Sequence, residues 1–169
     1  KLEAGAKYRE QKLVFLNNGN GTFRDASDDL GNALKIPQPS RGAAFGDLDN
    51  DGDIDVVVEN LDGGPMILRN DGGNQQHWIT LQLNGARSNR SAIGAFVKVQ
   101  SGPAAQVDEV RSGGSYLSQN DMRLHFGLGK SEKVERVEIR WPSGKMETVN
   151  DLAGNQFYTI KEGEGVVPS

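Results

Sequence analysis

Five aspartates alternate with other residues in one short segment, and their oxygen atoms could together bind a metal ion. The segment is Asp47-Leu-Asp49-Asn-Asp51-Gly52-Asp53-Ile-Asp55. So many like charges repel one another unless a cation lies among them. Oxygen ligands suit hard ions, and the flexible, high coordination number that such a loop allows favours Ca²⁺ over Mg²⁺. The segment, called the acidic loop below, therefore predicts a calcium site.

The spacing assigns a role to each aspartate of the acidic loop. Positions one, three and five, which are Asp47, Asp49 and Asp51, are expected to supply side-chain oxygens. Asp53 is expected to offer its backbone carbonyl, and Asp55 is expected to complete the site. The alternative is a solvated acidic turn that binds no metal.

The residues after the acidic loop distinguish it from an EF-hand. An EF-hand loop has a bidentate Glu at position twelve and continues into a helix. Here position twelve is Val58, the last residue of the run Val56-Val-Val58. A β-branched run of this kind favours a strand.

Two similar segments flank this loop and carry a family resemblance. The segment Leu13-Val-Phe-Leu-Asn-Asn18-Gly-Asn-Gly-Thr-Phe23 is similar to Met66-Ile-Leu-Arg-Asn70-Asp-Gly-Gly73, and Arg41-Gly-Ala-Ala-Phe-Gly-Asp47 leads into the acidic loop. Together they resemble an FG-GAP (VCBS-like) repeat, the unit of integrin-type β-propellers, in which a Ca²⁺ loop joins two strands of a blade. The resemblance implies part of a β-propeller over residues 1–75.

The first of these two copies lacks an acidic loop. In residues 1–12, which would hold it, the only acidic residues are Glu3 and Glu10. We therefore expect the chain to be the C-terminal piece of a longer protein, with its repeat packed on upstream propeller blades.

The second half of the chain contains a set of motifs in a fixed order: His77-Trp78, Ser88-Asn-Arg-Ser-Ala-Ile-Gly94, Arg111-Ser-Gly-Gly-Ser-Tyr116, Leu124-His-Phe-Gly-Leu-Gly129 and Trp141-Pro-Ser-Gly144. Together they resemble the ASPIC/UnbV domain, a family that follows FG-GAP repeats in exported bacterial proteins and in animal proteins. It implies an ASPIC/UnbV domain over residues 76–165, and it assigns no catalytic residue.

Hydrophobic alternation in this half predicts strands near 77–83, 95–99, 107–110, 134–141 and 157–160. Pro142-Ser-Gly144 predicts a hairpin turn, and a short helical segment is expected only around 26–34. Strands at such short intervals favour a β-sandwich or a small barrel. The expected fold class is thus all-β, a partial β-propeller followed by a C-terminal β-sandwich.

Composition excludes several classes of function. Residues 1–75 have 8 Lys and Arg against 13 Asp and Glu, and the remainder has 11 against 10. Neither half has the basic density of a nucleic-acid binder. No apolar run is long enough for membrane insertion by a helix. The chain has no cysteine, which excludes disulfides and thiolate metal sites.

Enzymatic patterns fail when tested on particular residues. Gly129-Lys130-Ser131 lacks the earlier glycine of a phosphate-binding loop, because Leu124 stands there. Ser115, His125 and Asp121 have the residue types of a hydrolytic triad, but Ser115 is not in a nucleophile elbow. The expected protein is not an enzyme.

The loop that begins at Arg111 is the best candidate for a second site. Arg111 could anchor a ligand and Tyr116 could stack against it, although the glycines between them could merely allow the loop to bend. The sequence thus predicts a calcium-stabilised binding or adhesion module, secreted, periplasmic or on the cell surface, with an extracellular protein or glycan as partner. Two alternatives stay open: a structural cap on a propeller, and an accessory domain of a carbohydrate-active enzyme.

Overall fold

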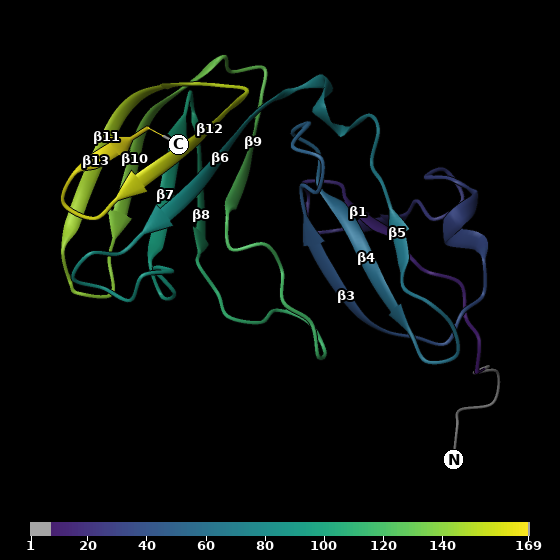
Figure 1. Ribbon diagram of the computed structural model, residues 1–169. Helices are drawn as coiled ribbons and strands as arrows, with labels where there is room; N and C mark the ends of the chain where they lie inside the picture. The colour runs from purple at the N-terminus through teal and green to yellow at the C-terminus, as the bar shows by residue number, and fades with distance from the viewer. Residues whose placement is uncertain (1–7, 169) are drawn as a thin grey trace.

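The computed structural model describes residues 8–168. They form an all-β structure in which the only helical elements are the short 3₁₀ helices η1 (Asn32–Lys35) and η2 (Gly73–Gln75). Figure 1 shows two parts side by side, with strands β1 to β5 in one and β6 to β13 in the other. The expected all-β class is confirmed, and the helical segment expected around 26–34 is reduced to η1.

The first part consists of two small antiparallel sheets. Strands β1 (Phe15–Asn17) and β2 (Phe23–Asp25) form a hairpin. Strands β3 (Ser40–Gly46), β4 (Asp55–Asn60) and β5 (Met66–Leu68) form a three-stranded sheet in that order. Its central strand is the β-branched run that follows the acidic loop. Strand β3 is at one edge of this sheet, so its outer side has no strand partner among residues 8–168.

The second part is a β-sandwich of two four-stranded sheets, with strand orders β11-β10-β7-β8 and β13-β12-β6-β9. One continuous apolar cluster, which includes Ile79, Leu81, Val97, Val137 and Ile139, packs between them. The strands are β6 (His77–Asn84), β7 (Phe96–Ser101), β8 (Ala104–Glu109), β9 (Leu124–Gly129), β10 (Lys133–Arg140), β11 (Met146–Ala153), β12 (Gln156–Lys161) and β13 (Gly165–Val167).

Strand β6 is buried on both faces. It pairs antiparallel with β9 on one side and parallel with β12 on the other. Ile79 and Leu81 point into the apolar core and are fully buried. Trp78 and Thr80, on the opposite face, are 8% and 2% exposed. This second face is covered because the acidic loop lies against it, as described below.

A buried carboxylate closes one end of the sandwich. Glu162, 3% exposed, follows β12 and accepts hydrogen bonds from the backbone N–H groups of Ala86, Arg87 and Ser88 at 2.8, 2.7 and 2.7 Å. The hydroxyl of Ser143, in the predicted hairpin turn, donates to it as well. Burial alone would raise the pKa of Glu162, but the Ser143 hydroxyl and these N–H groups outweigh it and lower the pKa to about 2.

Candidate metal centre and the junction beside it

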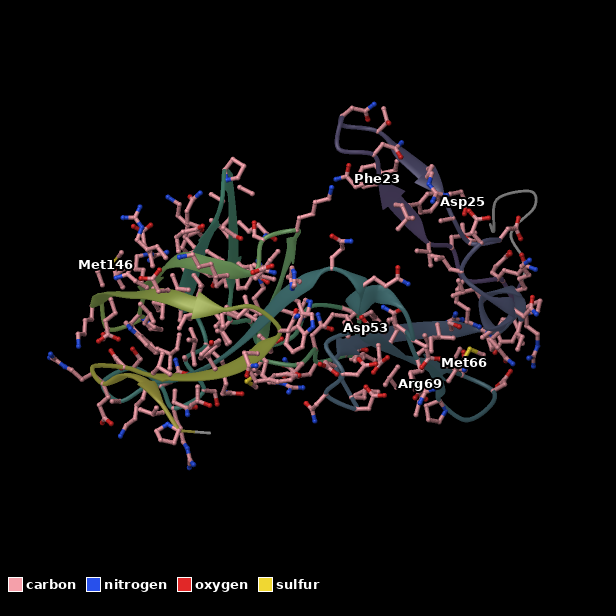
Figure 2. The ribbon with its side chains drawn as sticks, turned by 90° about the horizontal axis from the view of Figure 1, so that it is seen from above. Phe23, Asp25, Asp53, Met66, Arg69 and Met146 are labelled. Carbon is pink, nitrogen blue, oxygen red and sulfur yellow. The ribbon has the colours of Figure 1, made fainter. Side chains whose placement is uncertain are left out.

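The acidic loop connects β3 to β4 at the end of the sheet that faces the sandwich. Figure 2 labels Asp53, which lies between the two parts, while Met66 and Arg69 lie farther out on the repeat. The antiparallel strands β3 and β4 hold the two ends of the loop together, because Gly46 at the end of β3 pairs with Asp55 at the start of β4. The strand ladder thus brings the first and last aspartates of the loop close to each other.

Three of the five aspartates converge. Carboxylate oxygens of Asp47, Asp49 and Asp55 all lie within 4.8 Å of one another. Asp47 and Asp55 are 4% and 1% exposed, so two of these like charges are withdrawn from water. Among the described residues, Arg69 forms an ion pair with Asp49 of this group at 4.0 Å. Buried like charges with so little compensation, and an oxygen-only donor set, fit a hard divalent cation.

Backbone N–H groups orient the buried carboxylates. Asp47 accepts from Asp51 at 3.2 Å and from Gly52 at 3.0 Å. Asp55 accepts from Leu48 at 3.1 Å and from Asn70 at 2.8 Å. Because these donors come from the loop itself and from the segment after β5, the carboxylates are positioned by the fold and do not have to be gathered by a ligand.

The other two aspartates lie outside this group of three. Asp51 accepts a hydrogen bond from the N–H of Asp53 at 2.8 Å, which tightens the turn at Gly52. Asp53 is 2% exposed, and its Oδ2 accepts from the N–H of Gly73 at 2.9 Å. Its Oδ1 is the buried side-chain oxygen without a hydrogen-bond partner among the described residues. Burial raises the pKa of Asp53, the Gly73 N–H opposes this, and the charge of Asp51 adds to the rise.

Arg111 and Tyr116 lie in different surroundings. Arg111 pairs with Asp108 at 3.3 Å and lines a polar cavity of about 240 Å³ between the acidic loop and the sandwich. Tyr116 is 64% exposed and is not among the residues that line this cavity. Arg111 thus lines this cavity and Tyr116 does not, and their role in ligand binding stays a prediction.

Two residues that the sequence pattern did not single out for the metal site lie directly against the acidic loop. Arg123, just before β9, donates to the backbone carbonyl of Asp47 and to the side chain of Asn50, both at 2.7 Å. The indole of Trp78 lies so close to Gly52 that a Cβ there would overlap it. Gly52 also has φ +96, which L side chains rarely adopt. Arg123 and Trp78 both belong to the sandwich. Nothing in the sequence around either residue indicates that it contacts the repeat.

The fold and the site define a class of protein: an all-β module in which an acidic-loop repeat is followed by a β-sandwich. Comparisons with known families give two matches in the same order along the chain. The family described as "FG-GAP-like repeat" matches residues 5–58, and the family described as "ASPIC and UnbV" matches residues 85–167. The chain is therefore similar to an FG-GAP-like repeat over the first of these ranges and to an ASPIC and UnbV domain over the second, which confirms both resemblances seen in the sequence.

The matches to curated relatives extend over most of this chain. Cartilage acidic protein 1 from Homo sapiens is 30% identical over 128 residues, which cover 73% of this chain and 19% of the relative. The proteins of the same name from Mus musculus and Xenopus tropicalis are 30% and 28% identical, over 78% and 70% of this chain and 21% and 18% of their own length. The chain thus spans about a fifth of the length of the curated relatives it matches.

Proposed function

We propose that this chain is a non-catalytic, calcium-stabilised module of an extracellular protein. The observation that carries the proposal is the convergence of Asp47, Asp49 and Asp55, whose carboxylate oxygens lie within 4.8 Å of one another. A bound Ca²⁺ would neutralise their mutual repulsion, and these residues would hold it. The FG-GAP and ASPIC/UnbV assignments support the extracellular setting. Among residues 8–168, no helix has the length and hydrophobicity of a membrane span.

The non-catalytic assignment rests on what the candidate triad residues contact. His125 shares a hydrogen bond with Thr80 at 3.0 Å and stacks on Trp78. Asp121 pairs with Arg123 at 2.6 Å. Burial lowers the pKa of His125, while the charges of Asp47 and Asp53 work in the opposite direction. The imidazole of His125 and the carboxylate of Asp121 thus each have a structural partner, which supports a structural role for these two residues.

The contacts between the two parts favour a structural role for the sandwich. Strand β3 has an open edge, and open edges tend to pair with other chains. The segment after β8 covers this edge: the N–H of Phe45 donates to Asn120 at 3.1 Å, and the N–H of Asp121 donates to the carbonyl of Phe45 at 2.9 Å. We infer that the sandwich caps the repeat region.

Binding of an extracellular protein or glycan is the second candidate function. It is favoured by the tip of the same loop, where Tyr116 and Leu117 are 64% and 88% exposed. An exposed aromatic side chain on a loop is a common contact for such partners. Glycan-array or pull-down binding that is lost in Tyr116→Ala would support this role over a purely structural one.

The calcium proposal is tested by thermal unfolding with and without EGTA. If Ca²⁺ binds only the native state, a concentration about 100 times its Kd stabilises the fold by about 2.7 kcal/mol. We expect EGTA to lower the melting temperature of loaded protein, Ca²⁺ to restore it and Mg²⁺ to restore it poorly. An unchanged melt in EGTA would overturn the proposal.

A matched pair of variants locates the ion. Asp49 is the exposed member of the group of three, so Asp49→Asn removes one charge there without opening the protein interior. Asp28→Asn makes the same charge change in the same half of the chain, at a side chain that is 92% exposed. Calorimetry should show much weaker Ca²⁺ binding for Asp49→Asn and unchanged binding for Asp28→Asn. Equal affinities would place the ion elsewhere.

A further inference from the structure

One long loop of the sandwich, residues 110–123, connects β8 to β9 and reaches the open edge of β3. Figure 1 shows this connection descending from the sandwich toward β3. It satisfies both backbone polar groups of Phe45 on the open edge of β3, through Asn120 and Asp121. We call residues 110–123 the docking loop.

Two glycines of β3 make room for the docking loop. A Cβ at Gly42 would overlap the Ser118 side chain and would lie 2.7 Å from the carbonyl oxygen of Tyr116. A Cβ at Gly46 would lie 2.9 Å from Cβ of Asp121. Because these distances are shorter than real Cβ contacts, the loop could not lie this close to β3 with larger residues at either position.

Arg123, at the end of the docking loop, holds the acidic loop directly. Its side chain is 24% exposed and its three guanidinium nitrogens have different partners. Nε donates to Asp121 at 2.6 Å within the docking loop, whereas the other two donate to the Asp47 carbonyl and to Asn50 within the acidic loop. One side chain therefore connects the docking loop to two points of the candidate metal site.

An aromatic group on β6 and β12 supports this contact from the sandwich side. The guanidinium carbon of Arg123 lies 5.4 Å from the ring centre of Phe157, and Phe157 packs edge-on against Trp78 at 4.9 Å. Trp78 in turn lies against Gly52 at the turn of the acidic loop. The backbone that carries the carboxylates is thus in contact with the sandwich on two sides.

We propose that Ca²⁺ binding at the acidic loop and docking of the sandwich onto the repeat are one coupled equilibrium, with Arg123 as the positioning residue that links them. The inference rests on the proposed calcium site. Without the cation, repulsion among Asp47, Asp49 and Asp55 favours a more open loop, which withdraws the Asp47 carbonyl from Arg123. Coupling of two binding equilibria is reciprocal, so the docked sandwich raises calcium affinity and calcium favours docking.

Calorimetric titration with Ca²⁺ tests the first half of this reciprocity. Arg123→Ala should weaken calcium affinity about tenfold, as loss of a residue that orients metal ligands typically does. Arg123→Lys keeps the charge but cannot donate to all three partners, so its calcium affinity should lie between those of the unaltered chain and Arg123→Ala. Arg136→Ala is the control, since that side chain is 53% exposed on β10 and forms an ion pair with Glu138 on the same strand. Unweakened binding in Arg123→Ala would overturn the inference.

A second variant tests coupling without altering Arg123. Gly42→Ala should push the docking loop off β3 and weaken calcium affinity several-fold, although Gly42 is on the far side of Phe45 from the aspartates. Gly64→Ala is the matched control, because a Cβ there meets nothing within 4 Å. Equal affinities for these two variants would show that docking does not act on the metal site.

Fluorescence tests the second half of the reciprocity. Because the chain has no cysteine, Glu59→Cys and Lys130→Cys give one labelling site in each part. Energy transfer between dyes at these sites should change and become more uniform on addition of Ca²⁺, and the change should shrink in Arg123→Ala. Identical transfer in Ca²⁺ and EGTA, in protein that calorimetry shows to bind Ca²⁺, would overturn the coupling alone. Absence of calcium binding by the unaltered chain would overturn the proposed function and the coupling with it.

Discussion

The repeat and the sandwich bury their side chains in very different ways. The sandwich contains one continuous cluster in which Ile79, Leu81, Val97 and Ile139, among others, are fully buried. In residues 8–75, the buried apolar side chains are small or isolated, namely Ala26, Leu34 and Val58. The buried groups near the acidic loop are instead aspartates. Apolar packing is therefore extensive in the sandwich and sparse in the repeat.

The exposed apolar residues show the same contrast. The β1–β2 hairpin presents Leu13, Phe15 and Phe23 at 62%, 55% and 63% exposure. Figure 2 shows Phe23 on this hairpin, which projects from the rest of the repeat. A repeat unit normally buries such residues against the next unit, because each contacts only its neighbours. The repeat thus leaves large apolar side chains exposed, whereas the sandwich gathers most of its own into one continuous core.

The largest effect that tests this comparison is a cavity in the sandwich. Ile139→Ala, at a fully buried position of β10, should lower the free energy of unfolding by about 2–5 kcal/mol, because it removes packed methyl groups. Ile67→Ala, at a position of β5 that is 64% exposed, should lower it by less than about 1 kcal/mol. Urea denaturation measures both. Similar losses would mean that the repeat has a core comparable to that of the sandwich.

A medium effect is expected at the buried carboxylate of the sandwich. Glu162→Gln places an NH₂ group among N–H donors, so it should lower the free energy of unfolding by about 1–3 kcal/mol. Glu164→Gln, at an exposed side chain paired with Lys161, should change stability by less than about 1 kcal/mol. Thermal unfolding compares the two variants. If Glu164→Gln is the more damaging, the hydrogen bonds seen at Glu162 contribute little.

The same carboxylate predicts a pH dependence. Its pKa is lowered on folding from 4.5 to about 2, so the folded state favours the charged form. This stabilisation is fully present above the unfolded pKa and is lost as the pH falls from about 4.5 toward 2. Melting temperatures measured at intervals across this window should fall more steeply with decreasing pH for the unaltered chain than for Glu162→Gln. Parallel curves would contradict the assignment.

The smallest effect on stability is expected at the exposed hairpin. Phe23→Thr should change the free energy of unfolding by no more than about 0.5 kcal/mol, because the ring is mostly in water. It should nevertheless reduce self-association, since an exposed apolar hairpin is a site for contact between chains. Light scattering across a concentration series measures this. Val107→Thr, at a similarly exposed position of β8, is the control, and an equal reduction there would contradict the contrast.

The sequence predicted much of the strand content and the turn at Pro142-Ser-Gly144, because alternation and turn residues are local signals. It did not predict the parallel pairing of β6 with β12, or that Trp78 and Thr80 would be buried on the face opposite Ile79. Alternation assigns residues to two faces of a strand but does not tell which neighbour each face meets. Both faces of β6 have a partner, and the second partner lies in the other part of the chain.

The acidic loop was likewise visible in the sequence, since no other arrangement of aspartates in the chain is so dense. Which three of them converge was not, because that depends on how the turn at Gly52 directs each side chain. The role of Arg123 had no local signal at all. Gly42 and Gly46 could be recognised as small, but their use becomes apparent only when the docking loop lies across them.

The central place of β6 also has a consequence for biosynthesis. During translation, the hairpins β7–β8 and β10–β11 can form as soon as each is complete, because their partners are adjacent in the chain. Strand β6 must wait for β12, which emerges from the ribosome much later. Until then Ile79, Leu81 and Leu83 lie on a strand that lacks one of its two strand partners. The nascent sandwich therefore passes through a period in which β6 is exposed to chaperones or to other unfinished chains.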